Sequence, residues 1–107
     1  MGNEVLLYGV GGIMAGNIFP LENTTTIIGR NSSKCSIIYP ENATGVSGIH
    51  CQVRAAYPYL EITDLGSTYG TFYENGVKMQ KDTTYRLQNN EAFYIGEKKN
   101  RFIVKIK

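Results

Sequence analysis

The sequence is poor in the residues on which enzymes and metal sites depend. It contains one histidine, His50, and two cysteines, Cys35 and Cys51, in no metal-like spacing. A zinc site needs three or four ligands that converge on the ion, and one histidine with two scattered cysteines falls short of this. A serine or cysteine nucleophile would need His50 as its base, but Cys51 points to the opposite face of a strand and no oxyanion-hole signature accompanies Ser47. We therefore expect a non-enzymatic chain without a metal or cofactor.

Net charge and long apolar runs are also scarce. The formal net charge is +2 over 107 residues, which is too small to indicate nucleic acid or an anionic membrane as the main partner. No run of about 20 apolar residues is present, and Val5–Leu21 is broken by glycines, Asn17 and Pro20 and lacks a basic leader. We expect a cytoplasmic, monomeric domain without membrane insertion. Free thiols are favoured there for Cys35 and Cys51, although the sequence leaves a bridge between them open.

The hydrophobic pattern predicts strands rather than helices. Short alternating or apolar runs are separated by glycine, asparagine, proline and aspartate, and none keeps a 3.6-residue period over three turns. This indicates an all-β sandwich of about eleven short strands in two sheets, forming one domain over residues 1–107. The expected strands are Val5–Val10, Ile18–Leu21, Thr25–Gly29, Ser36–Ile38, Cys51–Ala56, Tyr59–Thr63, Thr71–Tyr73, Val77–Met79, Thr84–Arg86, Glu91–Ile95 and Arg101–Ile106.

Three connections in this pattern have recognisable turn chemistry. The segment Gly11–Ile18 has the glycine spacing of a phosphate-binding loop, but asparagine and isoleucine replace the lysine and the hydroxyl residue, so we interpret it as a hairpin turn. Asn75-Gly76 predicts a type I′ hairpin, because both residues tolerate a positive φ. Lys98–Arg101 is expected to be a solvated turn between the last two strands.

Polar loops between the strands carry a set of donors suited to an oxyanion. Arg30 follows a strand end, Ser47 lies three residues before His50, and Ser67 and Thr68 lie in a glycine-containing loop. A guanidinium binds phosphate through two parallel hydrogen bonds, and each hydroxyl adds one donor. The sequence by itself leaves open whether these loops meet in space.

The order and spacing of these motifs resemble the forkhead-associated (FHA) domain family, over roughly Thr25 to Lys107. The motifs are Gly29-Arg30, Ser47-x-x-His50, Asp64-x-x-Ser67-Thr68-x-Gly70-Thr71 and Asn75-Gly76. The resemblance implies an FHA-like sandwich that binds phosphothreonine in a protein or peptide, in signalling or regulated assembly. It also implies that such a unit belongs to a larger protein, and the run Gly45–His50 suggests a bacterial source.

The resemblance also implies a role for each motif residue. Arg30 would bind the phosphate, Ser47 would donate its hydroxyl to it, and Thr68 would add a contact from the opposing loop. A second group would hold these loops in shape. Its members are Gly29, His50, Asp64, Ser67, Gly70 and Thr71.

Two positions depart from the family pattern. Tyr69 replaces an asparagine that usually holds the peptide backbone, and a phenol lacks an amide's paired donor and acceptor. Gly48 replaces a larger polar or basic residue, for which the charge of Lys34 is a candidate substitute. These departures motivate an alternative hypothesis, in which a degenerate FHA-like domain mediates protein interaction or scaffolding without phosphorylation.

Overall fold

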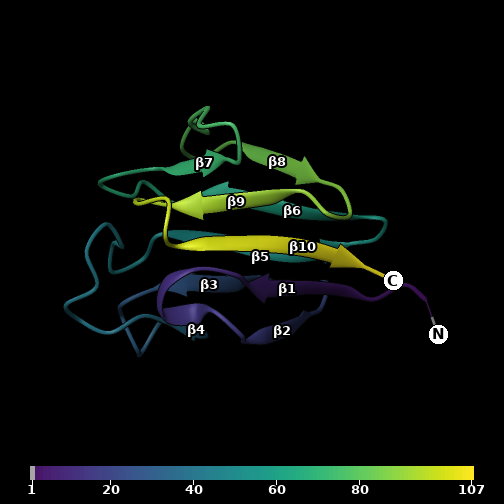
Figure 1. Ribbon diagram of the computed structural model, residues 1–107, viewed down its shortest axis with the longest axis horizontal. Helices are drawn as coiled ribbons and strands as arrows, with labels where there is room; N and C mark the ends of the chain where they lie inside the picture. Colours follow the sequence, from purple (N-terminus) through teal and green to yellow (C-terminus); the bar gives the residue numbers. More distant parts are fainter. Residues whose placement is uncertain (1) are drawn as a thin grey trace.

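The computed structural model describes residues 2–107 as two five-stranded sheets packed face to face (Figure 1). The strands are β1 (Val5–Gly9), β2 (Ile18–Leu21), β3 (Thr26–Gly29), β4 (Ile37–Ile38), β5 (Cys51–Ala56), β6 (Tyr59–Asp64), β7 (Thr71–Tyr73), β8 (Thr84–Leu87), β9 (Ala92–Ile95) and β10 (Arg101–Ile106). One sheet has the order β2-β1-β10-β9-β7 and the other β4-β3-β5-β6-β8. Only the β3–β4 pair is parallel among these strands. The all-β sandwich expected from the sequence is confirmed.

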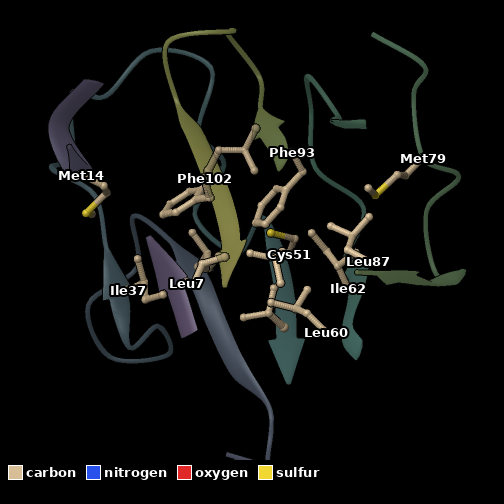
Figure 2. Close-up of a cluster of buried hydrophobic side chains, with 14 of the residues drawn as sticks. Leu7, Met14, Ile37, Cys51, Leu60, Ile62, Met79, Leu87, Phe93 and Phe102 are labelled. Carbon is tan, nitrogen blue, oxygen red and sulfur yellow. The ribbon is translucent and has the colours of Figure 1, made fainter. Parts of the chain in front are cut away.

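The two sheets are held together by one apolar core. Neighbouring residues of β5 point to opposite faces, so Cys51 and Val53 are fully buried while Gln52 between them is half-exposed. The facing sheet contributes Phe93 and Phe102, whose rings stack with centroids 5.3 Å apart (Figure 2). Burying a side chain of this size stabilises the fold by about 1.5–3 kcal/mol relative to leaving it exposed.

The predicted strand Val77–Met79 is absent, which leaves ten strands in place of eleven. The segment forms one isolated bridge, between Phe72 and Lys78, and no continuous ladder. The chain there leaves β7 in one sheet and crosses to β8 in the other. The Asp82 N–H then donates to the Asp64 carbonyl, 2.8 Å away, at the end of β6. A segment that changes sheets cannot extend a ladder, although its residues alternate as a strand's do.

The turn predictions meet different outcomes. The segment Gly11–Ile18 forms a hairpin connection between β1 and β2, with a short 3-10 turn, η1 (Gly12–Met14), inside it. The type I′ turn at Asn75-Gly76 is wrong, because only Gly76 has a positive φ, of 91°. The Gly76 N–H donates to the Tyr73 carbonyl, so the hairpin closes through three residues with the glycine last. This connection needs one left-handed residue where a type I′ turn needs two.

The loops that carry the predicted donors lie together at one end of the sandwich. They follow β3, precede β5 and connect β6 with β7, at the end opposite the chain termini (Figure 1). Cys35 and Cys51 are both free and buried. Residues 2–107 include no helix long and apolar enough to cross a membrane.

Candidate functional site

The end of β3 is joined directly to the loop that precedes β5. The Arg30 N–H donates to the Ser47 carbonyl at 3.1 Å, and the Asn31 N–H donates to the Gly48 carbonyl at 2.9 Å. A Cβ atom at position 29 would lie 2.3 Å from the Gly48 carbonyl oxygen. Only glycine at this position allows the two backbones to come so close. Gly29 therefore sets the distance between Arg30 and Ser47.

The Arg30 side chain is oriented by two backbone carbonyls. Its Nε donates to the Val46 carbonyl at 2.5 Å and its Nη1 to the Glu41 carbonyl at 2.9 Å. A guanidinium has five N–H donors, so three stay available. The half-buried side chain borders two grooves, of about 480 and 520 Å³. The loop thus presents a fixed cation whose remaining donors can reach a ligand.

The loop before β5 is held by the ring of His50, which is fully buried. The Ser47 N–H donates to its Nδ1 at 3.1 Å, so Nε2 carries the proton and donates to the Gly70 carbonyl at 2.8 Å. Burial lowers the pKa of His50 below its usual value, against smaller opposing effects of the Gly70 carbonyl and the Asp64 carboxylate. Because both ring nitrogens are occupied by backbone groups, His50 is not placed to take a proton from the Ser47 hydroxyl.

The loop between β6 and β7 is organised around the carboxylate of Asp64, which is 3% exposed. Oδ2 accepts the N–H groups of Gly66 and Ser67, both at 3.0 Å. Oδ1 accepts the hydroxyls of Ser67 and Thr71, both at 2.7 Å. Desolvation raises the pKa of Asp64, but these four hydrogen bonds outweigh it and hold the pKa below its ordinary value. The loop is therefore built around an ionised side chain.

The two loops meet at Ser47 and Thr68. The Thr68 N–H donates to the Ser47 Oγ at 2.9 Å, which leaves the serine hydroxyl hydrogen free to donate to a ligand. The Thr68 side chain is exposed, and its hydroxyl bonds to no group of the described residues. The Gly70 carbonyl accepts the N–H of Gly96 at 2.9 Å as well as the His50 ring. Hydrogen bonds therefore link Arg30 to Ser47 and Ser47 to Thr68.

The other predicted contact residues lie around this centre to different degrees. Tyr69 is 62% exposed and borders the groove of about 480 Å³ together with Arg30. Gly48 borders the second groove, and a side chain at this position would meet open space. Lys34 is exposed on the turn that follows Asn31 and borders neither groove. The structure therefore places Tyr69 and Gly48, and not Lys34, at the grooves that Arg30 borders.

The sequence interpretation missed a supporting residue, Asn100. Lys98–Arg101 was expected to be a solvated turn, and Lys98 and Lys99 are indeed exposed, but Asn100 is only 3% exposed. Its Nδ2 donates to the Ile95 carbonyl at 3.1 Å and to the Thr44 carbonyl at 3.4 Å. Asn100 thus ties the β9–β10 turn to the loop before β5. The only feature of the sequence that points to Asn100 is the position of an asparagine between two lysines and the start of a strand.

The remaining titratable groups form no metal site. Among residues 2–107, no three histidine, cysteine or acidic side chains converge closely enough to hold an ion. The arrangement at Arg30 instead offers N–H and O–H donors, which suit an anionic oxygen.

Comparisons with known proteins agree with this fold. The family model for the FHA domain matches residues 26–96. The structure is similar to the FHA domain of the CT664 protein from Chlamydia trachomatis, with 23% identity and a TM-score of 0.80 over 97% of this chain and 98% of that one. It is similar to the MEK1 FHA domain solved in complex with a HOP1 phosphothreonine peptide, with 20% identity and a TM-score of 0.77 over 96% of each chain.

A third similar structure comes from work on phosphothreonine-dependent FHA domain interactions. It is 27% identical, with a TM-score of 0.77 over 97% of each chain. Comparison with curated protein sequences gives no match.

Proposed function

Because the chain belongs to the FHA domain family, whose model matches more than half of its residues, we propose that it binds phosphothreonine in a partner protein, in signalling or regulated assembly. The observation that carries this proposal is the neighbourhood of three donors. The Arg30 guanidinium is fixed by two carbonyls, the Arg30 backbone N–H donates to the Ser47 carbonyl, and the hydrogen of the Ser47 hydroxyl is free. The domain acts by binding and not by catalysis.

The chemistry of the site matches a phosphate group. A phosphothreonine carries about −1.5 to −2 charge at pH 7 and three strong acceptor oxygens. The free N–H groups of Arg30 bind one or two of these oxygens, Ser47 donates its hydroxyl, and the Thr68 hydroxyl reaches in from the opposing loop. Each charge-assisted bond contributes about 1.5–3 kcal/mol net. After the ordering cost of a short peptide, three or four such bonds give a Kd on the order of micromolar.

Two of the similar structures support the choice of ligand. One is an FHA domain in complex with a phosphothreonine peptide, and another is described by its phosphothreonine-dependent interactions. The preference for threonine over serine that the family implies needs room for one methyl group, whose burial contributes about 1 kcal/mol. Phosphothreonine is therefore expected to bind about fivefold more tightly than phosphoserine in the same peptide.

The two unusual positions favour a second candidate function. Tyr69 is exposed where an amide would hold the peptide backbone, and Gly48 adds no side chain beside the phosphate. A domain with a weakened peptide grip could bind a folded partner through the same loops without phosphorylation. A partner captured equally before and after phosphatase treatment would support this second function.

The test is a titration of the domain with a phosphothreonine peptide library and its unphosphorylated counterpart, followed by calorimetry on the best sequences. We expect micromolar binding that disappears when the phosphate is removed. Arg30→Ala and Arg30→Lys should each weaken binding by at least about tenfold, since a lysine cannot replace the planar fork.

The matched control is Arg86→Ala, because Arg86 is a surface arginine, 63% exposed, on β8, an edge strand that β5 and β6 separate from β3. It should bind as the parent chain does. If no phosphopeptide binds, or if the Arg30 variants bind as well as Arg86→Ala, the proposed function is wrong.

A further inference from the structure

A third groove begins on the other side of Thr68. It has a volume of about 460 Å³ and lies between the β6–β7 loop and the segment that crosses from β7 to β8. The lining residues are Asp64, Ser67, Thr68, Lys78, Met79, Gln80 and Lys81. Thr68 therefore borders this groove on one side and contacts Ser47 on the other.

Lys78 is held at this groove through both its backbone and its side chain. Its backbone bridges to Phe72, and its stem lies across Gly70, because a Cβ atom at position 70 would be only 2.6 Å from the Lys78 Cε. Gly70 is two residues from Thr68. The ammonium group at the end of this stem is thereby held near the loop that faces the proposed phosphate.

The backbone of Lys81 is tied to the end of β6. It forms an isolated parallel bridge with Asp64, and it is exposed like Lys78. Met79, which lies between the two lysines, is 2% exposed and anchors the crossing segment in the core. The crossing that replaces the expected eleventh strand thus presents both lysines to one groove.

The charge of this groove is positive and unbalanced. Neither lysine has a carboxylate oxygen within 4 Å among the described residues. Asp64 lines the groove, but it is buried and its two oxygens already accept four hydrogen bonds. Asp82 follows Lys81 in the chain and does not line the groove. An anionic side chain entering the groove would meet two free ammonium groups.

We propose that this groove binds the carboxylate of an aspartate or glutamate close to the phosphothreonine, so that the ligand is an acidic phosphopeptide. An extended peptide advances about 3.3 Å per residue, so an acidic residue within about three positions of the phosphothreonine reaches a groove that borders Thr68. A carboxylate is favoured over a second phosphate, because the groove offers two point charges and no guanidinium fork. This inference rests on the proposed function.

The test compares four phosphothreonine peptides by fluorescence anisotropy at 50 and 200 mM salt. One has alanines around the phosphothreonine, one has two glutamates on its N-terminal side, one has them on its C-terminal side, and one has a second phosphate in place of the glutamates. One glutamate peptide should bind about 3- to 10-fold more tightly than the alanine peptide, with most of the gain lost at 200 mM salt. A preference for the second phosphate over both glutamate peptides would overturn the choice of carboxylate.

The variant Lys78→Gln/Lys81→Gln should bind the glutamate and alanine peptides equally, with the affinity for the alanine peptide unchanged. The matched control is Lys105→Gln/Lys107→Gln, which removes the same charge from the far end of the molecule, next to the C-terminus (Figure 1). It should keep the preference for glutamate. An equal loss in both variants would show that overall charge, and not this groove, selects the acidic peptide.

The outcomes separate this inference from the proposed function. If the parent chain binds all four phosphothreonine peptides equally and does not bind their unphosphorylated counterparts, the acidic selectivity is wrong and the proposed function stands. If it binds none of them, the proposed function is wrong and the inference is overturned with it.

Discussion

The two loops that face each other at the site, Thr44–His50 and Asp64–Thr71, are held by opposite chemistry. The first is anchored by a neutral imidazole, which accepts the Ser47 N–H and donates to the other loop. The second is anchored by an ionised carboxylate that accepts four donors from its own loop. One loop is therefore tied to its neighbour, and the other is tied to itself.

Because of this difference, we expect the first loop to depend on the second more than the second depends on the first. The anchors of the second loop lie two to seven residues from Asp64 along the chain, so this loop can keep its shape by itself. The first loop depends on distant groups, among them the Gly70 carbonyl, 20 residues away, and the Ser47–Thr68 contact across the site. Damage to the second loop should therefore reach the proposed phosphate donors of the first, while damage to the first should stay local.

The largest expected effect comes from removing the carboxylate of the second loop. Asp64→Ala leaves four donors without their acceptor, two of them backbone N–H groups, and should lower the free energy of unfolding by about 3 kcal/mol or more. Asp64→Asn keeps an acceptor and should cost about half as much. Urea unfolding at pH 7 measures both. A loss below about 1 kcal/mol in Asp64→Ala would show that the loop does not depend on this charge.

The second prediction separates the two anchors by pH. Burial holds the pKa of His50 below its unfolded value near 6.5, so the unfolded state binds the extra proton, and stability is lost as the pH falls below about 6.5. This loss amounts to at most about 2 kcal/mol between pH 7 and 5. The pKa of Asp64 is also lowered, but its contribution is lost only below the usual aspartate range, near pH 4.

The variant His50→Gln makes this separation measurable. It should be less stable at pH 7 and show a flatter dependence between pH 7 and 5, because the titrating group is gone. The steeper loss below about pH 4 should persist in it, since Asp64 is unchanged. A parent chain whose stability does not change between pH 7 and 5 would contradict a neutral, buried His50.

The same contrast explains what the sequence could predict of the site. Arg30 and Ser47 could be predicted because each belongs to a short sequence motif, with Gly29 and with His50. Gly29 and His50 each make a fixed contact close to a strand end. The loop after Asp64 was identified for a similar reason, since its hydrogen bonds are local. Both features depend on residues that are close together in the chain.

Contacts between distant segments could not be predicted in this way. The bond from Asn100 to the Thr44 carbonyl joins residues 56 apart, and nothing in either segment indicates the other. The alternation in Val77–Met79 matches a strand, yet the segment changes sheets, which depends on where β7 and β8 lie. The absence of Lys34 from the two grooves that Arg30 borders likewise follows from the path of a turn and not from residue type.

The third prediction concerns the contact between the loops. Ser47→Ala removes one proposed donor to the phosphate and the acceptor of the Thr68 N–H. Phosphopeptide affinity should fall about tenfold, because a charge-assisted hydrogen bond is lost. The cost in stability should stay below about 1 kcal/mol, since the Thr68 N–H is exposed and water can replace the serine. Calorimetry and urea unfolding measure the two effects, and a larger loss of stability than of binding free energy would make Ser47 structural.

The smallest expected effect belongs to Thr68, the contact that the second loop is proposed to make with the phosphate. Its side chain is exposed and forms no hydrogen bond with the described residues, so Thr68→Val should leave the free energy of unfolding unchanged within about 0.5 kcal/mol. The valine keeps the shape of the side chain and removes the hydroxyl alone. Phosphopeptide affinity should fall by about three- to fivefold, which is less than for Ser47→Ala, because the serine donor is fixed by its contact with the Thr68 N–H while the threonine hydroxyl is free to rotate. A larger loss of affinity in Thr68→Val than in Ser47→Ala would reverse the comparison and make the self-contained loop the principal phosphate binder.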